Sequence, residues 1–525
     1  QAYFNGKLYI GTGSIGTIFQ AAIKYIIGLL NITLPSEIEE GLKKYPPFIT
    51  DWANMTGPPG QWEVINYTAY LEWREANRAE IWRYNGSSWE MVYRSPLVNR
   101  TAWFKNANAT HPILVPREMG IRIMKVFNNT LYAGAGGLAG VIFRTESLLL
   151  ESVDGETWNV VPAPPQMGCD VRALEVHNGK LYVASREVTF YGGGNALIWA
   201  SDNPGVSPWT LVANLTRNDP PSSGNTGVIS LASFNGYLYA GTENIKYGFE
   251  VWRSNVSDPT DPINDWVKIV EYGAGDMMNY WAGTMKVYNG TLYVGSMLWP
   301  IMKEDENVTF MPRGFDLIRV YANDSWDLMV GAYFPRRPPP GYPDFRVPKS
   351  LWPAGFGNPF NIYVWWMEEY DGVLYLGTMD WSTILHFMPT SLLIELLGGE
   401  YGINGLINET INEFSAALSQ LEDMGVDENY IESLKDSIEL LQSIASNPNA
   451  SSLELLKEVF LRCFGGADLW KTVDGILWVP VTLNGFGNLF NYGIRVMQAT
   501  DRCNGYLYVG TANPFNGTEV LYAPK

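Results

Sequence analysis

The chain carries an excess of acidic side chains, which can bind hard cations or move protons. It has 54 aspartate and glutamate residues against 36 lysine and arginine residues, a formal net charge of −18. Glu304, Asp305 and Glu306 form an acidic run whose carboxylate oxygens suit a hard cation. Charge runs more often form solvated loops, and we interpret this one in that way. The sequence therefore predicts no metal site.

No other pattern of reactive residues indicates catalysis. The three histidines, His111, His177 and His386, lack the close spacing of metal ligands. The sequence contains no G-x-S-x-G nucleophile motif, no P-loop and no C-x-x-C-H haem attachment. We therefore predict no catalytic residue and no cofactor, and we lean against an enzyme. A chain with a pI near 4.7 would also repel a phosphate backbone, which argues against nucleic acid as a partner.

The most frequent chemical motif is N-x-[ST], the acceptor of N-linked glycans. It occurs fifteen times, whereas the composition would give about four or five by chance. We predict an exported, N-glycosylated protein of the cell surface or extracellular space, and a chain that starts at Gln1 fits removal of a signal peptide. The predicted glycosylation sites are Asn31, Asn54, Asn66, Asn85, Asn99, Asn108, Asn128, Asn214, Asn255, Asn289, Asn307, Asn323, Asn408, Asn449 and Asn516.

A short repeat indicates which elements position these residues. The pattern L-Y-x-[GA]-[TSA] occurs seven times, each time after Asn-Gly or a close variant, which supplies the positive φ angles of a type I′ hairpin turn. A second hairpin follows in each unit, and in six units its second strand opens with Trp. The repeats begin at Leu8, Leu131, Leu181, Leu238, Leu292, Leu374 and Leu507, and the third strands at Glu80, Val141, Leu197, Glu250, Leu317, Asp468 and Glu519.

The spacing of these repeats predicts the fold. The shortest distances between successive turns are 50 to 57 residues, which is the length of a four-stranded propeller blade. We predict an all-β chain, a seven-bladed β-propeller of four-stranded antiparallel blades that forms one domain over residues 1–525. Residues 13–79 are a partly helical insertion in blade 1. Residues 379–466 are a helical cap inserted in blade 6, as the apolar spacing of Ile431, Leu434, Ile438 and Leu441 indicates.

Two turns carry a resemblance to a known group of propellers. The sequence SVDGETW, from Ser152 to Trp158, resembles the Asp-box of sialidase-like propellers, and TVDGILW, from Thr472 to Trp478, is a weaker copy. Both are one residue shorter than the usual S-x-D-x-G-x-T-W. In that family the boxes are structural turns on the face away from the active site. The resemblance therefore supports the fold and transfers no catalytic residue.

One apolar segment, residues 15–34, is nearly long enough to span a bilayer. It carries Gln20, Lys24 and the Asn31 acceptor site, and its apolar residues recur at helical spacing. We interpret it as an amphipathic helix packed on the protein, and we predict no transmembrane segment.

The insertions fall on the propeller face that usually carries a ligand site, and several tryptophans lie near it. Aromatic rings stack on sugars, but propeller cores also bury many of them, and we place the core interpretation first. These residues are Trp299, Trp352, Trp365, Trp366 and Trp381.

Three cysteines, Cys169, Cys463 and Cys503, are too few for a disulfide framework. The strand assignment places Cys463 and Cys503 on opposite faces, about 17–20 Å apart. We therefore predict no disulfide between them.

Three functions remain open. The first is a structural or adhesive surface glycoprotein that assembles with itself or with other envelope proteins. It explains the many acceptor sites for glycans and the absence of a recognisable set of catalytic residues. The chain ends after the third strand of blade 7, so Val520 and Tyr522 would lie on an open edge where a neighbouring subunit could add a strand. The alternatives are a carbohydrate-active hydrolase or lyase, or a sugar-binding propeller, at the channel mouth. We favour the structural function.

Overall fold

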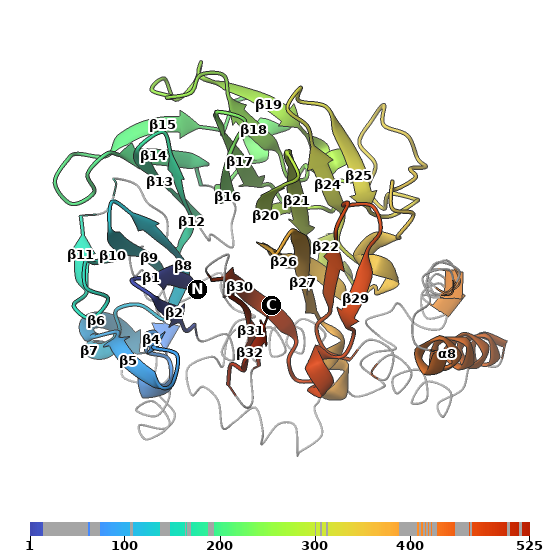
Figure 1. The fold of residues 1–525 in the computed structure, drawn as a ribbon. Coiled ribbons are helices and arrows are strands. Elements are labelled where there is room, and N and C mark those ends of the chain that lie inside the picture. The colour runs from blue at the N-terminus through green and yellow to red at the C-terminus, as the bar shows by residue number, and fades with distance from the viewer. Residues whose placement is uncertain are drawn as a thin grey trace. The chain divides into compact units, whose positions relative to one another are not determined.

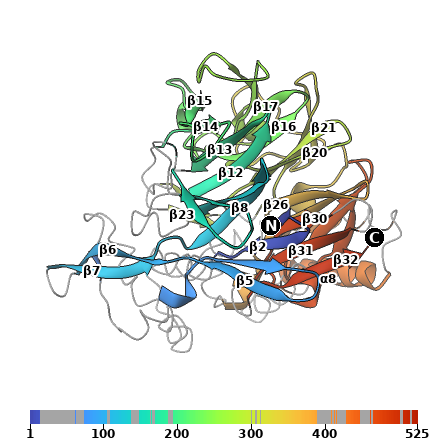
Figure 2. The same ribbon diagram turned by 60° about the vertical axis from the view of Figure 1, so that its left-hand side comes forward.

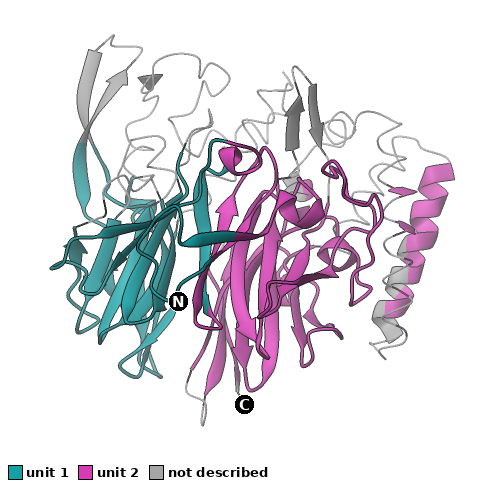
Figure 3. Cartoon of the chain, turned by 90° about the horizontal axis from the view of Figure 1, so that it is seen from above, with its two compact units in different colours: residues 1–218, 225–233, 254–267 teal, residues 219–224, 234–253, 268–525 magenta. Residues whose placement is uncertain are grey.

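The computed structural model describes residues 1–13, 61–62, 74–104, 109–136, 148–162, 164, 170–186, 194–299, 301–304, 307–310, 313–387, 407–408, 411–412, 415, 418, 422, 428–446, 461, 465–500, 505–513 and 517–524. These residues fall into two compact units (Figure 3). Unit 1 comprises residues 1–218, 225–233 and 254–267, and unit 2 comprises residues 219–224, 234–253 and 268–525.

Unit 1 is built mainly from structural repeats, each of which has four antiparallel strands (Figure 1). Repeat 1 is β1 (Ala2–Phe4), β2 (Lys7–Gly11), β4 (Glu80–Tyr84) and β5 (Trp89–Arg94). Repeat 2 is β8 (Gly120–Phe127), β9 (Thr130–Gly136), β10 (Leu148–Ser152) and β11 (Asn159–Val161). Repeat 3 is β12 (Asp170–His177), β13 (Lys180–Arg186), β14 (Leu197–Ser201) and β15 (Thr210–Asn214), and β16 (Gly227–Phe234) begins repeat 4.

A further sheet of unit 1, which the sequence did not predict, joins β3 (Gln61–Trp62), β6 (Leu97–Phe104) and β7 (Ala109–Pro116). Figure 2 shows the long β6–β7 hairpin extending away from β5.

Unit 2 continues the same pattern. It contains β17 (Tyr237–Glu243) and β18 (Val251–Ser254), while β19 (Trp266–Val270) begins in unit 1. Repeat 5 is β20 (Trp281–Tyr288), β21 (Thr291–Met297), β24 (Leu317–Val320) and β25 (Trp326–Val330), with the hairpin β22 (Ile301–Glu304) and β23 (Asn307–Phe310) between its second and third strands. Repeat 6 is β26 (Asn361–Tyr370), β27 (Val373–Asp380), β28 (Leu469–Thr472) and β29 (Val479–Thr482), and repeat 7 is β30 (Gly493–Ala499), β31 (Tyr506–Ala512) and β32 (Val520–Pro524).

Helices are few among the described residues. The short ones are α5 (Tyr272–Gly275), η2 (Ser222–Gly224), η3 (Ala354–Gly357), η4 (Ser382–Phe387) and η5 (Gly485–Gly487). The helix predicted in the cap is confirmed as α8 (Glu428–Ser446), and Ile431, Ile438 and Leu441 are buried on it. No helix of the described part is long and apolar enough to cross a membrane. The apolar segment 15–34 lies outside the described residues.

The predicted hairpin turns are confirmed where they are described. Asn178 and Gly179, for example, have φ angles of 46° and 75°, which is the left-handed pair that a type I′ turn needs. The leucine of every L-Y repeat is at most 2% exposed, so the repeat also supplies the core. The all-β prediction is therefore confirmed.

The glycine of the L-Y-x-G repeat lets consecutive repeats approach each other. A Cβ atom at Gly377 would lie 2.5 Å from Ile494 Cγ2, and one at Gly295 would lie 2.3 Å from Val364 Cβ. In both cases the contacted side chain belongs to the first strand of the next repeat.

Among the described residues, a single residue pair joins the end of the second strand, or the chain just beyond it, to the start of the next first strand in six of the seven repeats. In unit 1 these pairs are Gly13↔Gly120, Gly136↔Asp170 and Arg186↔Gly227. In unit 2 they are Glu243↔Trp281, Met297↔Tyr363 and Met379↔Gly493.

One strand assignment from the sequence is wrong. The third strand of repeat 2 is β10, Leu148–Ser152, and does not begin at Val141. The reason is its turn: Ser152 and Asp154 cap the hairpin between β10 and β11, which fixes the strand directly before the Asp-box.

Candidate functional site

The tight turns that resemble Asp-boxes are structural. Asp154 Oδ1 accepts hydrogen bonds from the backbone N–H groups of Glu156 and Thr157, at 2.8 and 2.7 Å, and Ser152 Oγ accepts one from Gly155. These donors hold the pKa of Asp154 well below its usual range. Asp474 caps the second box through the same pair of backbone donors.

The other residues singled out in the sequence have structural surroundings. His177 Nδ1 lies 2.7 Å from Ser233 Oγ and its Nε2 lies 2.9 Å from Ser257 O, so both ring nitrogens are engaged. Glu304 ends β22 at the turn of a hairpin, and Asp305 and Glu306 lie outside the described residues.

The tryptophans near the loops divide by burial. Trp352, Trp365 and Trp381 are 1%, 8% and 3% exposed, which supports the core interpretation over sugar stacking for these three. Trp299 and Trp366 are half-buried. His111 lies in β7 and His386 in η4.

The predicted glycosylation sites lie mostly in accessible positions where they are described. Asn214 is half-buried, Asn307 opens β23, and the exposed ones are Asn85, Asn99, Asn128, Asn255, Asn289, Asn323 and Asn408. The remaining acceptor sites and all three cysteines lie outside the described residues, so both the glycosylation and the cysteine predictions stay predictions.

Unit 1 contains an arginine cluster that the sequence analysis missed. The register of the first strands slips by one residue near their beginnings, between Ile121 and Ile123 in β8 and between Val171 and Ala173 in β12. The extra residue of each bulge is an arginine, Arg122 and Arg172. The side chain of a bulge residue does not follow the regular in-and-out alternation of its strand. The two bulges therefore change the direction of both arginine side chains near the beginnings of β8 and β12.

Asp170 is the carboxylate at the centre of this arginine cluster. Its Oδ1 accepts a hydrogen bond from Arg122 Nε at 3.1 Å, and its Oδ2 lies 3.5 Å from Arg172 Nε. Burial by itself would raise the pKa of Asp170, but the guanidinium groups of Arg122, Arg172 and Arg186 outweigh it and lower the pKa below its usual value. Asp170 is 4% exposed at the side chain, and Arg122 and Arg172 are 13% and 20% exposed. The accessible part of the cluster is therefore cationic.

A second buried acid, Glu118, lies two residues before β8. Its carboxyl accepts hydrogen bonds from Tyr93 Oη and from Arg117 Nε, the latter at 2.8 Å. Burial raises the pKa of Glu118 to about 8. Glu118 can therefore carry a proton at neutral pH, whereas Asp170 stays ionised.

The register places the two acids at the same end of unit 1. Gly120 pairs with Gly136, and Gly136 pairs with Asp170, so Gly120 and Asp170 lie one strand to either side of β9. Two strand spacings separate their backbones by about 10 Å. An ionised acid and a protonated acid that reach the same substrate bond can divide the roles of base and acid.

A sequence signal for this site existed. Arginine interrupts the apolar pattern at the third residue of the first strand in three repeats, as Arg122, Arg172 and Arg495. Glu118 gave no such signal, because the burial that raises its pKa arises only in the folded chain.

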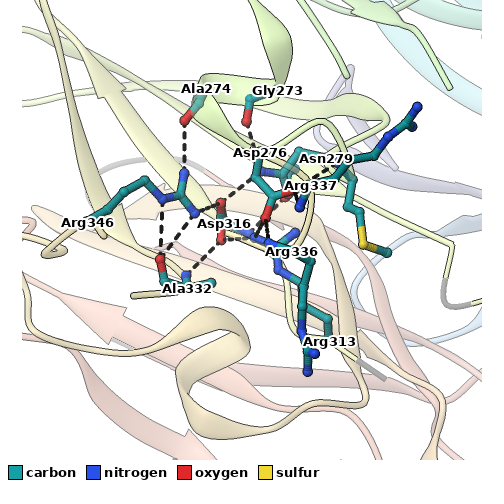
Figure 4. Close-up of polar contacts among 12 residues, drawn as sticks. Gly273, Ala274, Asp276, Asn279, Arg313, Asp316, Ala332, Arg336, Arg337 and Arg346 are labelled. Carbon is teal, nitrogen blue, oxygen red and sulfur yellow. Dashed lines mark hydrogen bonds and ion pairs between the residues drawn. The ribbon is translucent and has the colours of Figure 1, made fainter. Parts of the chain in front are cut away.

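Unit 2 has a different polar centre in repeat 5, shown in Figure 4. Arg313 Nη2 lies 2.9 Å from Asp316 Oδ1 and 3.1 Å from Asp276 Oδ2, and Arg346 Nη2 lies 2.9 Å from Asp316 Oδ2. Asn279 Nδ2 donates to Asp316 Oδ2 at 2.8 Å. Two arginines balance two aspartates, and all but Arg346 are at most 2% exposed at the side chain, so this centre is structural.

A pair of buried acids lies in repeat 6 of unit 2. Burial, followed by the charge of Asp468, raises the pKa of Asp380 well above its usual value. Burial also raises the pKa of Asp468 to about 7. Both residues are buried, at 0% and 2% exposed.

Comparison with known proteins gives structural matches alone. No family model and no curated protein matches the chain. The endo-arabinanase from Bacillus licheniformis matches with 13% identity and a TM-score of 0.26, over 49% of this chain and 87% of the enzyme. The exo-β-1,3-galactanase from Bifidobacterium bifidum and the α-L-arabinofuranosidase from Clostridium thermocellum each match with 13% identity, over 50% of this chain and 82% of theirs, with TM-scores of 0.28 and 0.27.

These matches count against the main functional prediction from the sequence. A structural or adhesive, self-assembling protein is contradicted by neighbours that are named as glycoside hydrolases, and the carbohydrate-active alternative agrees with them better. Val520 and Tyr522 lie in β32, which pairs with β31, and their assembly role falls with that prediction. The low identity and TM-scores assign no activity to this chain.

Proposed function

We propose that the chain is a carbohydrate-active hydrolase whose site is formed by Glu118, Asp170 and the arginine cluster of unit 1. The observation that carries the proposal is the contrast between the two acids: arginines keep Asp170 ionised, while burial raises the pKa of Glu118 to about 8. Acid–base chemistry at neutral pH needs one group in each state.

The roles follow from these states. Glu118 supplies the proton that the leaving glycosidic oxygen needs, and Tyr93 Oη contacts its carboxyl group. Asp170 acts as the base or the nucleophile on the other side of the scissile bond. Arg122 and Arg172, the more exposed members, bind oxygen atoms of the sugar through charge-assisted hydrogen bonds.

The same proposal includes the finer fold. Seven L-Y repeats, and the residue pairs that join consecutive repeats within each unit, support a seven-bladed propeller with this site at the loop end of its first strands. We also propose that the protein is exported and N-glycosylated, as the acceptor sites indicate.

The experiment is a screen of the purified protein against chromogenic glycosides and polysaccharides, followed by variants on any substrate that is cleaved. Asp170→Asn and Glu118→Gln should each lower kcat/KM by a factor of about 10² or more, as expected for loss of a general base or acid. Glu175→Gln is the matched control, because Glu175 lies on the same strand as Asp170 and pairs with Lys125 at 2.8 Å. Full activity in Asp170→Asn would exclude this site.

A further inference from the structure

Three turns of unit 2 share a sequence pattern and a backbone conformation. Residues 273–279, 355–361 and 485–491 read GAGDMMN, GFGNPFN and GFGNLFN. In each, the first three residues have positive φ, for example 60°, 60° and 85° at Gly355, Phe356 and Gly357. The final asparagine closes the turn by donating to the carbonyl of its first glycine, as Asn361 Nδ2 does to Gly355 O at 3.0 Å.

The same asparagine also holds the acid that opens the third strand of its repeat. Asn279 Nδ2 donates to Asp316 at 2.8 Å, Asn361 Nδ2 to Asp468 at 2.6 Å, and Asn491 Nδ2 to Glu519 at 2.7 Å. Repeats 5, 6 and 7 therefore present three equivalent buried or half-buried acids, and their surroundings can be compared directly.

In repeats 5 and 7, both oxygens of the acid and the Oδ1 of the asparagine have hydrogen-bond or ion-pair partners. In repeat 5, Arg313 and Arg346 contact Asp316, as Figure 4 shows, and Ser296 Oγ donates to Asn279 Oδ1 at 2.9 Å. In repeat 7, two asparagine amides donate to Glu519, and Asn513 Nδ2 donates to Asn491 Oδ1 at 3.0 Å.

Among the described residues, repeat 6 lacks the arginine contacts of repeat 5 and departs from repeat 7 at Asp380. Asp380 follows Thr378 by two positions, as Asn513 follows Thr511, so a carboxylate stands where repeat 7 has an amide donor. Asp380 accepts hydrogen bonds from Asn358 Nδ2 at 2.7 Å and from Ser382 N at 2.7 Å. Within the described part of the chain, neither Asp380 nor Asp468 makes an ion pair.

A buried oxygen atom beside this pair, Asn361 Oδ1, lacks a hydrogen-bond donor, and its residue is 0% exposed. Asp468 is 2% exposed, and the side chains of Trp470 and Asn358 lie close to its carboxyl group. A buried acceptor without a partner is costly, and so is a second carboxylate without a counter-charge. Both costs disappear if a cation stands where the guanidinium groups stand in repeat 5.

We propose that repeat 6 binds a divalent cation, for which Ca²⁺ is the best match, through Asp380, Asp468 and Asn361 Oδ1. Two carboxylates balance its charge, and carboxylate and amide oxygens are the ligands that Ca²⁺ prefers. Ca²⁺ also tolerates irregular oxygen sites, whereas Mg²⁺ demands near-octahedral geometry and retains several waters. The cation is a structural one, which ties the end of β27 to the start of β28 and to the turn before β26.

The experiment measures metal content and thermal stability of the full-length protein. The desalted wild type should retain about one Ca²⁺ per chain by elemental analysis. After chelation, its Tm should rise by roughly 2 to 3 °C when Ca²⁺ is added at 100 times its Kd. Asp380→Asn restores the donor of repeat 7 and should abolish both the retained metal and the response to Ca²⁺ while the protein stays folded. Glu519→Gln changes the equivalent acid of repeat 7 and should leave both unchanged.

Three results would overturn the proposal. One is a wild type that retains no metal and has the same Tm with Ca²⁺, Mg²⁺ or chelator. A second is retained metal in Asp380→Asn at the wild-type level. If the wild type instead becomes more stable as the pH falls through about 7, a shared proton on the two acids replaces the cation, and the proposal is wrong.

Discussion

Asp170 shows how the surroundings of a single residue depart from the repeat. Its carboxylate is met by arginines from three strands: Arg122 of β8, Arg172 of β12 and Arg186 of β13. Two of them occupy bulges, where the extra residue does not follow the alternation of its strand. The repeat supplies the scaffold, and the bulge residue changes from one repeat to the next.

The stability of the protein should depend on pH through Asp170. Its pKa is lower in the folded protein than the value of about 3.9 for an unfolded chain. Its ionised form therefore stabilises the fold above about pH 4, and this contribution is lost as the pH falls through the folded value. Asp170→Asn should have a lower Tm than the wild type at pH 7, and the gap should narrow below pH 4. Melting curves between pH 3 and pH 7 measure it, and a gap that does not change with pH would contradict it.

At the scale of the element, the glycine of L-Y-x-G is a packing residue. It lies within its strand beneath a side chain of the next first strand, and its φ is not in the left-handed region at Gly377 or Gly295. The requirement is space, since any Cβ would overlap a β-branched side chain.

Gly377→Ala should therefore destabilise the protein by about 1–3 kcal/mol, the usual cost of overpacking a core. The added Cβ would lie 2.5 Å from Ile494 Cγ2. Gly13→Ala is the control, because its Cβ would meet its nearest atom at 3.6 Å, an ordinary contact. Chemical denaturation of both variants checks the prediction, and equal losses would show that the space above Gly377 is not what matters.

The elements were predictable from the sequence to the extent that local patterns specify them. Asn-Gly turns and the L-Y repeats gave the hairpins, because their φ angles and burial are set by neighbouring residues. The third strand of repeat 2 was placed too early, since Val141 begins an equally apolar run. The candidate site was missed because the charge states of Asp170 and Glu118 depend on burial in the folded chain and, for Asp170, also on Arg122 and Arg186 of other strands.

At the scale of the whole molecule, surface chemistry is the property that the sequence predicts most directly. Seven of the described acceptor asparagines are exposed, in turns, strands and helix alike. Protein purified from its native source should exceed 58.8 kDa by the mass of several glycans. Intact mass spectrometry before and after deglycosylation measures this, and a native mass equal to that of the polypeptide would refute it.

The residue pairs that join consecutive repeats also indicate where the chain can be cut or extended without loss of the sheets. The longest connections begin directly after the paired residues Gly13 and Met379, so each is fastened at its base to the next repeat. When a protease cuts such a connection, the strands on either side of the cut still pair with each other, β2 with β4 or β27 with β28. The nicked protein should therefore migrate as one particle on size exclusion and separate into fragments only in denaturant. By the same reasoning, these connections are positions where peptides or small domains can be grafted while the sheets remain intact.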